Sequence, residues 1–120
     1  MTDIQNAIPL TPVVFHILLA LANGERHGYE IMKIVKRDSN DSIKIGNGTL
    51  YGSLKRMLAD ELIEDVGDRT DESETRRRYY KLTDLGRQLL NAEIQRYNHT
   101  VRVIQGYQLI PSLQARGQAA

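Results

Sequence analysis

The sequence predicts a mainly α-helical, α+β fold: a winged helix-turn-helix followed by a C-terminal dimerisation helix. Three amphipathic helical patterns come first, between residues 11 and 61. Two short β-type runs follow, at 62–66 and 76–83, and a long helical pattern with a repeated apolar seam comes last. Three helices followed by a two-stranded ribbon are the element order of a winged helix-turn-helix. We expect that domain at residues 1–83, the dimerisation helix at 84–110 and a flexible tail at 111–120.

Composition narrows the class of protein. The 120 residues correspond to about one domain. The chain has no cysteine, and its three histidines lack the spacing of metal ligands, so we expect no disulfide, no metal and no cofactor. No apolar run approaches the ~20 residues that span a bilayer. The N-terminus also lacks the features of a secretory signal, so we expect no membrane contact and a cytoplasmic location.

The net charge of +1 hides an alternation of sign along the chain. Residues 60–74 contain one basic and eight acidic side chains, whereas residues 76–116 contain eight basic and two acidic ones. A basic surface can therefore exist locally and attract a polyanion in spite of the nearly neutral total.

Each of the first three helices has a recognisable start or buried face. The first begins with Thr11 as N-cap and Pro12 in the first helical position, and Asn23-Gly24 ends it. We expect His27 to be a helix-start or packing residue of the second helix rather than a catalytic base. The apolar positions of the second helix are Tyr29, Met32, Ile34 and Val35. The third helix, at 48–61, has the buried spacing Leu50, Leu54, Met57 and Leu58.

The two strands are expected to pair as an antiparallel hairpin with a long polar tip. If Leu82 points inward, the period of two places Tyr80, Arg78 and Arg76 on its face of the second strand. The opposite face then carries Lys81, Tyr79 and Arg77.

The last helix has a heptad-type seam, in which apolar residues are separated by 4, 3, 4 and 3 positions. Thr83 is its expected N-cap and Pro111 its expected end. A domain this small cannot cover the whole seam, so we expect a two-fold homodimer. The alternative is that the helix packs back on the first helix of its own chain. The expected dimer-interface residues are Leu90, Ile94, Tyr97, Val101 and Ile104.

A glycine inside the third helix, Gly52, needs an explanation, because it costs ~1 kcal/mol relative to alanine. With the leucines of this helix inward, Gly52 lies on the opposite face together with Thr49, Ser53 and Arg56. We expect this face to enter the DNA major groove, where a missing side chain permits close approach. Gly48 likewise lets the chain enter the helix next to a phosphate. The alternatives are a tolerated helix glycine or tight packing against the second helix.

The side chains around Gly52 suit contact with nucleic acid. Lys55 and Arg56 are expected to contact phosphates, which set register and salt dependence rather than sequence preference. Thr49 and Ser53 can reach phosphates or base edges. Tyr51 either donates its hydroxyl proton to a phosphate or packs against the domain.

The predicted ribbon carries basic and acidic groups close together. Arg69 and the run 76–78 are expected to contact the DNA backbone or minor groove. The acidic tip, TDESE, is repelled by phosphate, so we expect it to bend away or to pair with those arginines. The alternative is that the arginines only form salt bridges with the neighbouring acidic loop.

Four segments in order, HGYEI, GTLYGSLKRM, RRRYYKLT and LGRQLL, resemble PadR-type transcriptional regulators over roughly residues 10–105. The resemblance implies a dimeric bacterial repressor with a single C-terminal helix, which releases DNA when it binds a small molecule. Asn47 stands where many relatives have proline, and we expect its side chain to cap the third helix. The lack of tryptophan removes the flat aromatic drug-binding platform of some relatives. The family's recognition-helix contacts fall on Thr49, Tyr51, Ser53, Lys55 and Arg56, and Tyr29 matches a tyrosine near the DNA face, although its own pattern also fits the core.

The sequence therefore predicts a dimeric, sequence-specific DNA-binding transcriptional regulator, most simply a repressor released by a small-molecule effector. We expect no enzyme activity, because none of the usual catalytic groupings occurs. The expected partners are palindromic double-stranded operator DNA, a second copy of the chain and a possible effector. The alternative is a winged-helix module that binds protein. The expected DNA-binding residues are Tyr29, Gly48, Thr49, Tyr51, Gly52, Ser53, Lys55, Arg56, Arg69, Arg76, Arg77 and Arg78.

Overall fold

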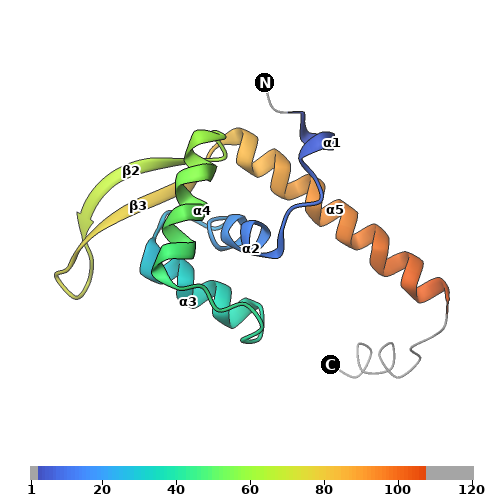
Figure 1. The fold of residues 1–120 in the computed structure, drawn as a ribbon, viewed down its shortest axis with the longest axis horizontal. Coiled ribbons are helices and arrows are strands. Elements are labelled where there is room, and N and C mark those ends of the chain that lie inside the picture. Colours follow the sequence, from blue (N-terminus) through green and yellow to red (C-terminus); the bar gives the residue numbers. More distant parts are fainter. Residues whose placement is uncertain (1–2, 108–120) are drawn as a thin grey trace.

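The computed structural model describes residues 3–107, and the predicted elements occur in the predicted order, with the unpredicted α1 and β1 in addition. In Figure 1 the helices α2, α3 and α4 lie together, the β2–β3 hairpin extends to the left as a wing, and α5 runs to the right away from them. The predicted helix end at Pro111 and the predicted tail lie outside the described residues. The elements are α1 (Ile4–Ala7), α2 (Pro12–Ala20), β1 (Arg26–His27), α3 (Gly28–Asp38), α4 (Asn47–Ala59), β2 (Ile63–Thr70), β3 (Arg76–Leu82) and α5 (Asp84–Gly106).

The helix starts follow from short-range hydrogen bonds. Thr11 caps α2 by accepting the backbone N–H of Val14 at 3.3 Å, as predicted. His27 caps α3 through its Nδ1, which accepts the N–H of Glu30 at 3.3 Å, and the Glu30 carboxylate accepts the N–H of His27 at 3.2 Å. This reciprocal capping box confirms that His27 is a helix-start residue. The cap predicted for Asn47 is wrong: Gly46 is the N-cap of α4, and no side chain bonds there.

The core is built from one face of each of the three helices, closed by the sheet and by the start of α5. In α3 the prediction was partly wrong, because Ile31 and Val35 are buried while Tyr29 is half exposed. The buried apolar residues are Ile17, Leu18, Ala20, Leu21, Ile31, Val35, Leu50, Leu54, Met57, Leu62, Ile63, Tyr80, Leu82, Leu89 and Leu90.

The sheet has three antiparallel strands in the order β1-β3-β2. The short strand β1 was not predicted, and β2 continues to Thr70, well into the segment expected to be a loop. A bulge between Asp65 and Gly67 bends the hairpin, and Gly67 adopts the positive φ of 93° that suits glycine there. Tyr80 and Leu82 are buried, which confirms the predicted inward face of β3.

The start of α5 packs tightly against the end of the α4–β2 connection. Thr83 caps the helix by accepting the N–H of Gly86 at 3.0 Å, as predicted. A Cβ on Gly86 would lie 2.0 Å from the carbonyl oxygen of Leu62, so only glycine permits this approach. Leu90 is 2% exposed and belongs to the core of its own chain, so its predicted place in the dimer interface is wrong. None of the helices in the described part of the chain is long and apolar enough to cross a bilayer.

A buried carboxylate fastens the N-terminal segment to α5. Glu93 is fully buried and accepts the backbone N–H of Leu10 at 2.9 Å and the Nε–H of Arg96 at 2.6 Å. The hydrogen bond from Arg96 is the largest of the effects that hold the pKa of Glu93 below its usual value. No local pattern predicts this contact, because the partner of Glu93 is a backbone group 83 residues away.

We expect Glu93→Ala to lower the free energy of unfolding by about 2 kcal/mol, because it leaves a part-buried N–H and a guanidinium without their acceptor. The pKa of Glu93 is lower in the folded state than in the unfolded state. Its carboxylate therefore contributes to the free energy of unfolding above the pKa of the unfolded state, and this contribution is lost as the pH falls through the pKa of the folded state. Urea unfolding between neutral pH and ~pH 3 measures both effects. Glu72→Ala, which removes an exposed carboxylate, is the control, and equal pH profiles for the two variants would refute the role of Glu93.

Candidate nucleic-acid interface

The packing of α4 decides which of its side chains are free. Leu50, Leu54 and Met57 are buried, and Leu58 is only partly buried. The buried face therefore includes three of the four predicted residues and turns away from Leu58. This rotation turns Ser53 inward, where it is 3% exposed, so its predicted place on the free face is wrong. Thr49, Gly52, Lys55 and Arg56 are exposed, as predicted, and Gly48 and Tyr51 are exposed as well.

The glycines of α4 face open space. A Cβ on Gly52 would meet no atom within 4 Å, and the same is true of Gly48. Tight packing against α3 is therefore not the reason for Gly52. The close approach of α3 and α4 uses Gly28 instead, where a Cβ would lie 2.8 Å from the hydroxyl of Tyr51 and 3.2 Å from Cδ2 of Leu50.

Two half-exposed tyrosines flank the contact between α3 and α4. Tyr51 places its hydroxyl over Gly28, and Tyr29 lies between two cations, with its ring centroid 5.2 Å from Nζ of Lys33 and 5.3 Å from Cζ of Arg77. Tyr29 thus lies at the surface between α3 and the wing, and its alternative role in the core does not hold.

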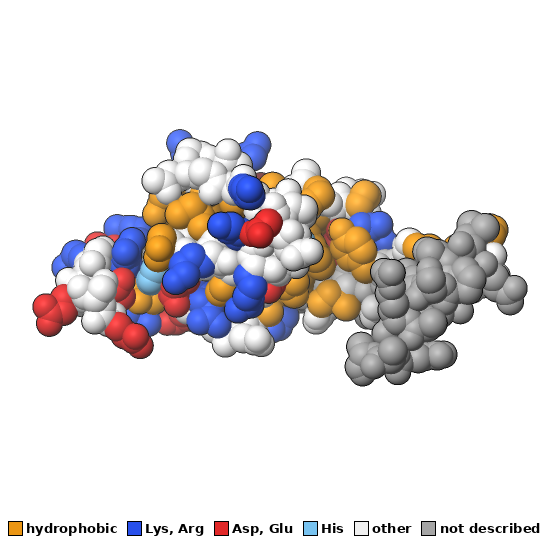
Figure 2. Space-filling model, turned by 90° about the horizontal axis from the view of Figure 1, so that it is seen from below, with side chains coloured by type: hydrophobic (Ala, Val, Ile, Leu, Met, Phe, Trp, Pro, Cys, Tyr) orange, Lys and Arg blue, Asp and Glu red, His pale blue; other side chains and the backbone are white. Residues whose placement is uncertain are grey.

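Exposed cations cover α3, α4 and the segment between them. Figure 2 shows Lys and Arg side chains gathered across the face seen from below, and Asp and Glu side chains at the left end, where the wing lies. Within residues 3–107, no ion pair involves Lys33, Lys36, Lys44, Lys55 or Arg56. The first three of these were not predicted as contacts, although their basic character is visible in the sequence.

The arginines of the wing all have acidic partners. Nε of Arg76 lies 3.1 Å from Asp68, and Nε of Arg77 lies 3.1 Å from Asp71. Arg78 pairs with Asp65 and, at 3.4 Å, with Asp68, while Arg69 pairs with Glu25. Salt bridges to the predicted loop segment, the alternative for these arginines, are therefore present through Asp68 and Asp71, while Glu25 and Asp65 are partners from outside it.

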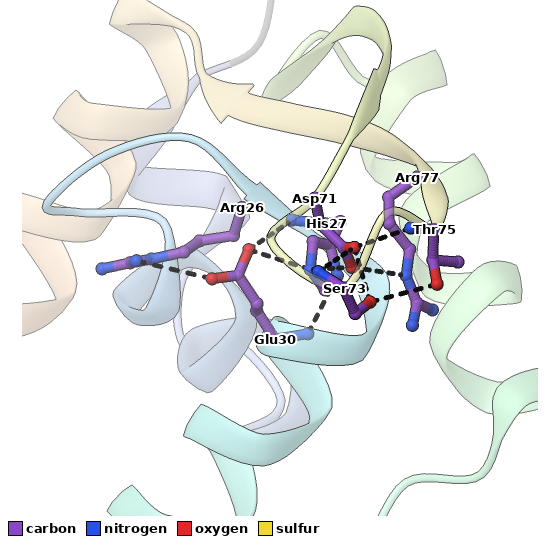
Figure 3. Close-up of polar contacts among 7 residues, drawn as sticks. All are labelled: Arg26, His27, Glu30, Asp71, Ser73, Thr75 and Arg77. Carbon is purple, nitrogen blue, oxygen red and sulfur yellow. Dashed lines mark hydrogen bonds and ion pairs between the residues drawn. The ribbon is translucent and has the colours of Figure 1, made fainter.

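The tip of the wing turns back towards α3, as Figure 3 shows. Asp71 accepts the N–H groups of Ser73 and Thr75, both at 3.0 Å, and the hydroxyl proton of Ser73 at 2.6 Å. Its second oxygen lies 3.1 Å from Nε of Arg77 and 3.8 Å from Nε2 of His27. The Ser73 hydroxyl is the largest of the causes that lower the pKa of Asp71 to about 2, so this carboxylate is charged at neutral pH.

A cleft lies beside α4 and reaches from its buried face to Arg56 at the edge of its free face. Its volume is about 490 Å³, and the N-terminal segment, α4 and α5 form its walls. Leu10, Met57 and Leu89 give it an apolar lining, and Ser53, Arg56 and Asp60 contribute polar atoms.

Comparison with known proteins identifies the relatives of this arrangement. A sequence model of the Transcriptional regulator PadR-like family matches residues 17–92. A Lysinibacillus sphaericus protein named Uncharacterized protein X is 32% identical over 89 residues, which are 73% of this chain and 80% of that protein.

Solved structures share the fold. A PadR family transcription regulator from Clostridium difficile R20291 is 28% identical, with a TM-score of 0.68 over 81% of this chain and 98% of that chain. Bacillus subtilis PadR, crystallised in complex with operator DNA, is 24% identical, with a TM-score of 0.60 over 70% of this chain and 47% of that chain. The predicted fold class is confirmed, and the family description agrees with the expectation of a regulator rather than an enzyme.

We expect Gly52→Ala to raise the free energy of unfolding by ~0.5–1 kcal/mol, because the added methyl group meets only solvent and alanine favours the helix. Gly86→Ala is the matched control in α5, and it should lower that free energy by ~1–3 kcal/mol or more, because its Cβ overlaps the Leu62 carbonyl. Urea unfolding measures both. A loss of stability in Gly52→Ala would show that this face of α4 is not open.

Proposed function

The chain belongs to the PadR-like family of transcriptional regulators, and we propose that it binds operator DNA as a homodimer, with α4 in the major groove. The observation that carries the proposal is the free face of α4, where Gly52 faces open space and the exposed Lys55 and Arg56 have no acidic partner within residues 3–107. Bacillus subtilis PadR, whose fold this chain shares, was crystallised in complex with operator DNA, which supports DNA as the partner here.

The chemistry of α4 fits a groove contact. Its first turn has no side-chain cap, so backbone N–H groups at the positive end of the helix dipole are open to a phosphate. Lys55 and Arg56 would neutralise further phosphates, and Thr49 and Tyr51 offer hydroxyl groups to phosphates or base edges. Gly48 and Gly52 keep this surface low enough for close approach. Ser53 is buried, so we no longer assign it a contact.

Dimerisation would use the outer half of α5, which extends beyond the other helices in Figure 1. Ile94, Tyr97, Val101 and Ile104 remain 36–49% exposed at heptad-type spacing, and Val103 is exposed beside them. Tyr97 also contacts Phe15 of its own chain, at 4.8 Å between ring centroids. A second copy that covers this seam would present two α4 helices to a palindromic site with half-sites ~34 Å apart.

Repression with release by an effector is the simplest regulatory scheme for such a dimer. A bound dimer would block a promoter, and the cleft beside α4 offers room for a small, largely apolar molecule. Because Ser53 and Met57 line both this cleft and the buried face of α4, a ligand there would act on the position of the helix.

We expect Arg56→Ala to weaken binding to all DNA sequences and to reduce the slope of log K against log salt by ~1, because one phosphate contact is lost. Arg87→Ala removes the same charge from α5, where Arg87 donates to the carbonyl of Ala22, and should leave the slope unchanged. Fluorescence anisotropy on DNA selected from a random pool measures both slopes. Unaltered binding by Arg56→Ala would favour protein rather than DNA as the partner of α4.

We expect wild-type protein to be a dimer and the double variant Ile94→Glu/Val101→Glu to be a folded monomer, because charge cannot be buried unpaired in an apolar interface. Gln95→Glu/Arg102→Gln changes the net charge equally at exposed positions of the same helix outside the seam, and it should remain dimeric. Sedimentation velocity with circular dichroism distinguishes the states. A seam variant that stays dimeric would place the interface elsewhere.

A further inference from the structure

Given the DNA binding proposed above, we infer that the wing carries its own competitor for phosphate. In this inference three carboxylates of the wing, those of Asp65, Asp68 and Asp71, pair with the arginines at 76–78 when DNA is absent. They keep the sequence-independent affinity of the protein low and leave more of the discrimination to α4. The wing carboxylates would thus determine specificity, without contact to any base.

The register of the hairpin creates the pairing. Asp68 lies directly opposite Arg78, and Arg69 directly opposite Arg77, so each couple shares a face of the ribbon. On the first face, Asp68 lies between two arginines, 3.1 Å from Nε of Arg76 and 3.4 Å from Nη2 of Arg78. On the second face, Arg69 and Arg77 are held by Glu25 and Asp71. Both faces are therefore close to neutral.

The distribution of charge supports the same view. Between residues 63 and 82 the wing has six acidic and five basic side chains. Between residues 28 and 59, which include α3 and α4, there are six basic and three acidic side chains. The attraction for a polyanion is therefore concentrated on α3 and α4, and the wing adds arginines without adding net positive charge.

Because each arginine must exchange a carboxylate for a phosphate, the wing contributes little to the affinity for DNA. Exposed ion pairs are only marginally stable, so a phosphate can displace a wing carboxylate from its arginine. The displaced carboxylate stays nearby and repels the phosphate, which reduces the gain. Sequence-independent binding depends almost entirely on such phosphate contacts and on the counterions they release. A site-specific complex keeps the base contacts of α4 in addition, so it loses a smaller share of its affinity.

Asp68 is the residue that tests this inference most cleanly. Asp71 also accepts three hydrogen bonds that shape the wing tip, and Asp65 also accepts the N–H of Gly67 at 2.8 Å in the bulge. The side-chain contacts of Asp68 within the described residues are with arginines alone. Asp68→Asn therefore leaves Arg76 without an acidic partner and Arg78 with Asp65 alone, and it removes no support of the wing backbone.

The experiment compares Asp68→Asn with Glu64→Gln on a duplex of random sequence, by anisotropy over ~50–200 mM KCl. Glu64 lies on the same strand and pairs with Lys81 at 3.0 Å, so its replacement changes the net charge equally at the base of the wing. We expect Asp68→Asn to bind at least ~3-fold more tightly and to steepen the salt slope by ~1, because Arg76 becomes free for a phosphate, and Glu64→Gln to change both much less.

A double-mutant cycle with Arg76→Ala gives a second, independent readout. Removal of Arg76 should weaken binding only slightly in the wild type and by ~3-fold or more in the Asp68→Asn background, because only there is the arginine free for phosphate. Three results would overturn the inference while leaving the proposed function intact. They are equal effects of Asp68→Asn and Glu64→Gln, no effect of either variant, and additive effects of Asp68→Asn and Arg76→Ala in the cycle. Failure of the wild-type protein to bind any duplex at ~50 mM KCl would instead refute the proposed function itself.

Discussion

The burial of one face of α4 is the constraint on which the rest of the structure depends. Leu50, Leu54 and Met57 enter the core that α4 shares with α2 and α3, and they fix the rotation of the helix about its axis. Gly52 and its cationic neighbours are then left facing solvent. The surface proposed to meet DNA is thus determined as much by the packing behind α4 as by the residues that form it.

Charge and apolar surface are divided between separate parts of the chain. Lys33, Lys55 and Arg56 lie on helices and form no ion pair within the described residues, whereas the register of the hairpin sets opposite charges side by side. The exposed apolar seam lies apart from both, on the outer half of α5. Because Glu93 fastens the N-terminal segment to α5, the helix that would carry the partner subunit is anchored to the domain that would bind DNA.

Short-range signals in the sequence predicted the order of the elements, and long-range contacts limited the rest. The caps at Thr11 and Thr83 and the inward face of β3 depend on neighbours within a few residues, so the sequence alone is enough. The inward turn of Ser53 depends on whether Met57 or Leu58 packs more deeply, which periodicity does not decide. The burial of Glu93 and Leu90 and the pairing of the wing arginines depend on segments brought together only by folding.

Two α4 helices held about one turn of DNA apart are the property that the proposed function requires. The chain has no cysteine, so Lys55→Cys provides a single spin-label site on the exposed side of α4 in each subunit. Double electron–electron resonance on the free protein should give one main distance of roughly 34 Å, the spacing of successive major grooves on one side of a duplex. The absence of dipolar coupling, or a main distance far from one or two helical turns, would contradict the proposed docking of the dimer on DNA.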